Sequence, residues 1–187
     1  MRVLRKRCAV SYDPYTLPAD LPVPLDDGAA DHLVGLELPD LTLESSHGDV
    51  NVRDFAVLYV YPQAGRPGRD LLPGWNETPG ARGCTPQSCA FRDLYPELGV
   101  AVAGLSAQPL DDQQEFAERN HMPFPVIADP ELELGAALDL PTFEIEGRVL
   151  YKRLTLVSDN ARIVKVFYPV FPPDENAADV LRYLQSR

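Results

Sequence analysis

The chain has 187 residues, which is enough for one domain with a hydrophobic core of ordinary size. Its formal net charge is -11, and such an acidic surface repels phosphate backbones, so nucleic-acid binding is not expected. The longest apolar runs, FAVLYV and VAVAGL, are far too short to cross a bilayer, so we expect no membrane segment.

The first 32 residues are predicted to form an extended arm. They are rich in proline and aspartate, most clearly in LPADLPVPLDDGAADH. The basic start, MRVLRKRCAV, is not followed by the apolar stretch of a secretory signal. We therefore expect a cytoplasmic protein with reduced thiols. Cys8 is expected to have no functional role, and the folded domain is expected over 33–187.

From residue 33 the pattern alternates between strands and helices. Alternating or continuous apolar runs predict strands at 36–45, 55–61, 100–106 and 124–130, and a hairpin at 148–170. Helices are predicted at 85–99, 111–121, 131–140 and 174–185. This order predicts an α/β fold in which helices cover a central mixed sheet.

An irregular segment, 62–83, interrupts the alternation and contains four prolines and five glycines. Long irregular loops inside a compact domain are usually functional or disordered. The next helix is predicted to begin near Thr85 and Pro86, because threonine is a good N-cap and proline is favoured at the first helical position.

Two cysteines, Cys84 and Cys89, lie at the start of that helix. The unpaired N–H groups and the positive dipole end of a helix favour a thiolate over a thiol. Positions five apart in a helix are about 8 Å apart at Cα, whereas a disulfide needs about 7 Å or less. A bond between these thiols therefore requires local unwinding. Structural burial of both cysteines is the alternative, and a zinc site is not expected because the histidines are isolated in sequence.

The stretch GCTPQSCAFRD, after a strand that ends in YP, resembles the peroxiredoxins. It is most similar to the peroxiredoxin Q, or bacterioferritin comigratory protein, branch of these AhpC/TSA-like proteins. Its signature corresponds to Cys84, Thr85, Cys89, Phe91, Arg92 and Asp93. Further on, YKRLTLVSDNARIVKVFYPV looks like the family's arginine strand and its hairpin partner, and the resemblance then places the active-site arginine at Arg153.

The resemblance covers 33–187 and implies a thioredoxin-like fold and a thiol-dependent peroxidase of hydrogen peroxide and organic hydroperoxides. Cys84 would be the peroxidatic cysteine, which becomes a sulfenic acid, and Cys89 the resolving cysteine, which forms a disulfide with it. Arg153 would stabilise the thiolate, and Pro62 would shield the site. No cofactor is implied. The partners would be a hydroperoxide and a thioredoxin-like reductant, and the protein would be a monomer or a weak homodimer.

Two departures from the family pattern leave alternatives open. Ala81 occupies the position of a family hydroxyl residue, so either Thr78 or Thr85 would supply that group, or the group is missing. The PGA before the site resembles the atypical two-cysteine branch, in which Cys89 would attack, but the signature and the helix start favour Cys84. The same cysteine pair would also suit a non-catalytic thioredoxin-fold redox sensor or binding module.

Overall fold

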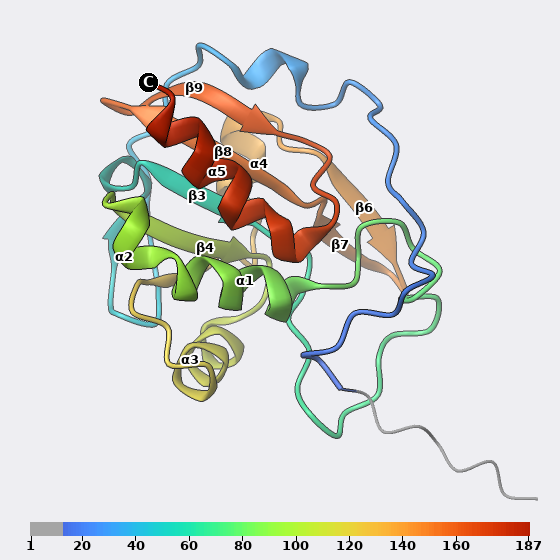
Figure 1. The fold of residues 1–187 in the computed structure, drawn as a ribbon. Coiled ribbons are helices and arrows are strands. Elements are labelled where there is room, and N and C mark those ends of the chain that lie inside the picture. The colour runs from blue at the N-terminus through green and yellow to red at the C-terminus, as the bar shows by residue number, and fades with distance from the viewer. Residues whose placement is uncertain (1–12) are drawn as a thin grey trace, which may run out of the picture.

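The computed structural model describes residues 13–187, and these form a five-stranded mixed sheet covered by helices on both faces (Figure 1). The sheet consists of β3 (Val57–Val60), β4 (Val102–Ser106), β5 (Val126–Ala128), β8 (Leu154–Asp159) and β9 (Arg162–Phe167). Its order is β5-β4-β3-β8-β9. Strand β3 runs parallel to β4 and antiparallel to β8, so it lies at the centre of the sheet.

Two small strand pairs lie outside this sheet: β1 (Thr42–Leu43) with β2 (Val50–Asn51), and β6 (Thr142–Ile145) with β7 (Arg148–Tyr151). The α-helices are α1 (Cys84–Asp93), α2 (Tyr95–Leu98), α3 (Leu110–Arg119), α4 (Glu133–Leu138) and α5 (Asn176–Gln185). Short 3-10 turns are η1 (Asp31–Leu33), η2 (Val52–Asp54) and η3 (Pro173–Glu175).

Strand β3 is buried on both faces, and its alternate side chains enter two separate hydrophobic cores. Leu58 and Val60 face the core that also includes α4. Val57 and Tyr59 face the core beneath α1, α3 and α5. Figure 1 shows α1 and α5 side by side on this second face, and the two helices are in contact. The α/β architecture with a central mixed sheet is confirmed.

The strand predicted at 36–45 is mostly wrong, because only Thr42–Leu43 is a strand. At and just before the start of the segment, the backbone N–H groups of Leu38 and Gly35 donate to the carbonyls of Ala161 and Ile163. Pro39 has no N–H to donate, which prevents a continuous ladder.

The hairpin predicted at 148–170 is only partly correct. Strands β8 and β9 pair as expected, but β7 pairs with β6, which the sequence pattern did not reveal. The helix predicted at 85–99 also stops at Asp93, and α2 follows it. Pro96 lies in this region and cannot donate a backbone hydrogen bond to the preceding turn.

Helix α1 begins one residue earlier than predicted, at Cys84, so Thr85 is not its N-cap. The N-cap is Gly83, with φ of 100°, a left-handed conformation that favours glycine. A Cβ on Gly83 would collide with the Pro173 ring of η3 and would lie 3.1 Å from Leu17 Cδ2. Because Gly83 has no side chain, the start of α1 can pack directly against η3.

We expect Gly83→Ala to lower the free energy of unfolding by about 2–5 kcal/mol, because a left-handed non-glycine residue costs about 1–2 kcal/mol and overpacking about 1–3 kcal/mol. Urea unfolding of the purified variant measures this change. Gly48→Ala is the matched control, since Gly48 has φ of 94° and no atom within 4 Å of an added Cβ. An equal loss in both variants would mean that the contact with Pro173 contributes nothing.

Candidate active site

Cys84 lies at the first position of α1, in the core beneath that helix, and is only 3% exposed. Its Sγ accepts a hydrogen bond from Arg153 Nη2 at 3.2 Å. The same sulfur lies 3.6 Å from the carbonyl oxygen of Ala81. The start of a helix and a guanidinium group both stabilise negative charge, and both lie at Cys84 Sγ.

Arg153 lies between β7 and β8 and is 3% exposed. Its Nη2 donates to the three consecutive carbonyls of residues 80–82 at 3.0–3.3 Å, and its Nη1 donates to Gln87 Oε1. All of these acceptors are neutral. No ion pair of Arg153 with a carboxylate is found in the described part of the chain. A buried charge is costly without a counter-charge. A thiolate at Cys84 would supply that counter-charge to the buried guanidinium of Arg153.

A chain of buried amides continues from Arg153 into the core. Gln87 Nε2 donates to Asn176 Oδ1 at 2.9 Å, and Thr155 Oγ1 donates to the same oxygen at 2.7 Å. These side chains hold the guanidinium in place through the first residue of α5. Sequence reasoning missed Gln87 and Asn176. Gln87 could have been identified as a site residue, because it lies three residues after Cys84 on the same helix face. No sequence pattern pointed to Asn176.

Cys89 lies on the same helix but in different surroundings. It is half-buried, and its Sγ lies 3.8 Å from Asn120 Oδ1. Burial raises the pKa of its thiol, and Arg92 opposes that shift only in part. Folded α1 therefore keeps Cys89 as a thiol. Both cysteines are unbridged in the described structure, as the helical spacing predicts.

The remaining site candidates are less directly connected to the sulfur. Pro62 is buried and follows β3 closely. Thr85 is buried, and its hydroxyl has no hydrogen-bond partner within residues 13–187. The Thr78 hydroxyl donates to the Gly74 carbonyl at 2.8 Å. Neither hydroxyl therefore replaces the one missing at Ala81 by a hydrogen bond to Cys84, and Cys8 lies outside the described residues.

The irregular segment 62–83 contains no helix or strand, as predicted, but it packs firmly on the β6–β7 pair. Trp75 is buried there with Ile145 and Leu150, and its ring centre lies 6.4 Å from that of Phe143. Trp75 thus anchors the segment. Its position fixes the course of the chain that leads into Cys84.

Among residues 13–187, no group of three or more histidine, cysteine, aspartate or glutamate side chains is arranged to hold a metal ion. None of the helices in this part of the chain has the length and apolar character that a transmembrane span requires.

The family model described as Redoxin matches residues 33–181, which is most of the chain. The chain belongs to the redoxin family. Within it, the relatives place the chain among the peroxiredoxins of the Bcp and Q type, which are thiol peroxidases and hence oxidoreductases. The resemblance drawn from the signature that starts at Cys84 is therefore confirmed.

Individual relatives agree with this assignment. Peroxiredoxin Bcp of Bacillus subtilis (strain 168) is 28% identical over 165 residues, which cover 82% of this chain and 95% of the relative. The chloroplastic peroxiredoxin Q of Gentiana triflora is 26% identical, and the match covers 79% of this chain but only 64% of that relative. The crystal structure of peroxidoxin BcpB from Mycobacterium tuberculosis superposes with a TM-score of 0.65 at 25% identity, covering 82% of this chain and 96% of that chain. The peroxiredoxin has the expected thioredoxin-like fold.

Proposed function

We propose that Cys84 is the peroxidatic cysteine of this peroxiredoxin and that hydrogen peroxide and organic hydroperoxides are its substrates. One observation carries this proposal. Cys84 Sγ lies 3.2 Å from a buried guanidinium whose other hydrogen-bond partners are neutral. Among residues 13–187, Cys89 has no such partner, and burial raises the pKa of its thiol. The thiolate of Cys84 is therefore the better nucleophile, which argues against the reversed roles.

The proposed reaction has three steps. The Cys84 thiolate attacks one peroxide oxygen, so an S–O bond forms, the O–O bond breaks, and the alkoxide or hydroxide takes a proton and leaves as alcohol or water. Arg153 stabilises the thiolate and the negative charge that develops on the leaving oxygen. Cys89 then attacks the sulfenic acid, which releases water and forms a disulfide. An external dithiol reduces that disulfide and returns both thiols.

The second step requires movement of α1. Residues five apart on a helix are about 8 Å apart at Cα, whereas a disulfide tolerates about 7 Å, so the first turns must unwind. Unwinding also exposes Cys89 to water and so removes the burial that raises its pKa. The resolving thiol is therefore kept unreactive in the folded helix and becomes reactive when the helix opens.

The remaining roles and partners are proposed from the family. Thr85 and Pro62 shape the site, and a thioredoxin-type protein supplies the electrons, so no bound cofactor is needed. A cytoplasmic location is proposed because the cycle returns both cysteines to thiols, which suits a reducing compartment, and because the bacterial Bcp relatives suggest it. We propose a monomer or a weak homodimer.

The test is peroxide consumption by the native protein with thioredoxin, thioredoxin reductase and NADPH, followed by mass spectrometry of protein treated with one equivalent of peroxide. We expect continuous turnover and a peptide in which Cys84 is bonded to Cys89. Stoichiometric oxidation without turnover would instead support a redox sensor. Thiols that resist peroxide altogether would contradict both functions.

A further inference from the structure

The described part of the N-terminal arm, residues 13–32, contacts the surroundings of Cys84, although it lies outside the family match at 33–181. Figure 1 shows the arm running beside the loop that enters α1 and on toward β9. The Thr16 carbonyl accepts a hydrogen bond from Arg82 Nη2 at 2.9 Å, and Leu17 packs near Gly83. The arm is thus placed against the residues that come directly before the peroxidatic cysteine.

A polar latch fixes the end of the arm. The Asp27 carboxylate accepts hydrogen bonds from Lys152 Nζ at 2.5 Å and from the Tyr168 hydroxyl at 2.6 Å. The hydrogen bond from Lys152, followed by that from Tyr168, holds the pKa of Asp27 below its usual value. Since Lys152 directly precedes Arg153, the latch connects the arm to the link between β7 and β8, which carries the active-site arginine.

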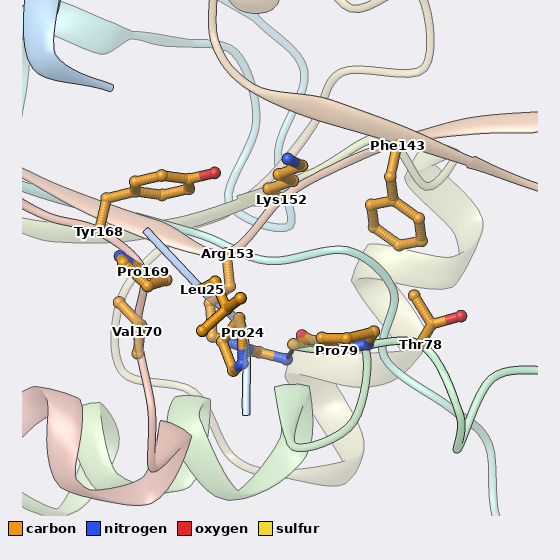
Figure 2. Close-up of a pocket in the computed structure, with 11 residues that line it drawn as sticks. Pro24, Leu25, Thr78, Pro79, Phe143, Lys152, Arg153, Tyr168, Pro169 and Val170 are labelled. Atoms are coloured by element: carbon orange, nitrogen blue, oxygen red, sulfur yellow. Dashed lines mark hydrogen bonds between the residues drawn. The ribbon is translucent and has the colours of Figure 1, made fainter. Parts of the chain in front are cut away.

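Between the latch and the active site lies a pocket of about 230 Å³. The residues that line it, drawn in Figure 2, come from five separate parts of the chain. Its apolar lining includes Pro24 and Leu25 of the arm, Pro79, Phe143 and Val170, and Arg153 also lines it. Hydrogen peroxide is only slightly larger than water, which occupies about 30 Å³ in the liquid, so it would leave most of this pocket empty.

Leu25 lines this pocket, and 84% of its surface is exposed. A leucine left in water beside an apolar pocket gains burial when an apolar group enters. Arg153 reaches both the pocket and Cys84 Sγ, so a molecule in the pocket lies next to the residue that would polarise a peroxide.

We propose that residues 24–27 select the substrate: Pro24 and Leu25 form one wall of a pocket that takes the organic group of a bulky hydroperoxide. This inference rests on the proposed peroxidase function. Asp27 acts as a positioning residue, because it holds that wall in place through Lys152 and Tyr168.

The experiment compares Leu25→Ser and Asp27→Asn with the native protein. Single-turnover rate constants for the oxidation of Cys84 are measured with cumene hydroperoxide and with hydrogen peroxide. We expect the ratio of the two constants, cumene hydroperoxide over hydrogen peroxide, to fall about tenfold in Leu25→Ser, the size of effect that a lost hydrophobic contact has on discrimination. Asp27→Asn is expected to lower the same ratio, since it weakens the latch.

Two matched controls lie in the same arm. Val23→Ser removes an exposed apolar side chain that does not line the pocket, and Asp20→Asn removes an exposed carboxylate. Neither should change the ratio. An unchanged ratio in Leu25→Ser, or an equal fall with both peroxides, would overturn the inference while the peroxidase stands.

Oxidation of native Cys84 by neither peroxide would reject the proposed function itself. Binding of 2-phenyl-2-propanol, the alcohol formed from cumene hydroperoxide, is followed by NMR as a readout that needs no turnover. We expect Leu25→Ser to weaken this binding. Binding that is equally strong in Leu25→Ser and in the native protein would place the organic group elsewhere.

Discussion

Cys84→Ser is expected to reduce peroxide turnover to background, a loss of roughly 10⁶-fold, because a serine hydroxyl beside Arg153 is not a thiolate and removing a covalent nucleophile has effects of this order. Cys89→Ser is expected to keep the first oxidation and to accumulate the Cys84 sulfenic acid, since only the resolving thiol is lost. Stopped-flow oxidation with one equivalent of peroxide, followed by trapping of the sulfenic acid with dimedone, separates the two results.

Cys8→Ser provides a control with the same chemical change at the remaining cysteine of the chain, and it should turn over as the native protein does. Addition of a small thiol should restore turnover to Cys89→Ser but not to Cys84→Ser. If dimedone instead labelled Cys89 in the Cys84→Ser variant, the two roles would be reversed and the enzyme class would survive.

Arg153→Ala is expected to slow the oxidation of Cys84 by about 10²–10³-fold, the loss seen when one preorganised donor to a developing negative charge is removed. The guanidinium lies 3.2 Å from the sulfur and is 3% exposed, so little solvent screens it. Alkylation of Cys84 by iodoacetamide at neutral pH should slow as well, since the sulfur loses its hydrogen bond from the guanidinium. Both rates are measured on the same protein preparation.

Arg153→Lys tests whether a positive charge alone is sufficient for fast oxidation of Cys84. An ammonium lacks the planar fork with which Arg153 bonds Sγ and Gln87 at once, so we expect a rate between those of Arg153→Ala and the native protein. Arg182→Ala removes an arginine whose side chain is 70% exposed and serves as the control. A native rate in Arg153→Ala would show that the thiolate forms without this arginine.

Part of the site was predictable because its signals are local. The pair Cys84 and Cys89 was predicted from the spacing and from the helix start, and the resemblance implied the roles that we propose for them. Arg153 followed from the resemblance alone, since no periodicity connects it with Cys84. The exact start of α1 was missed, because Gly83 was not recognised as its N-cap and the contact that requires a glycine there involves Pro173, far away in the sequence.

The sequence by itself determined the strands and helices that have strong periodicity, the two thiols at the start of one helix, and the family. These features depend on neighbours within a few residues. Only the tertiary structure decided which groups surround Cys84: the carbonyls of 80–82 around Arg153, the amide chain through Asn176, and the arm held by Asp27. These contacts join segments far apart in the chain, and packing of helices and loops on the sheet brings them together.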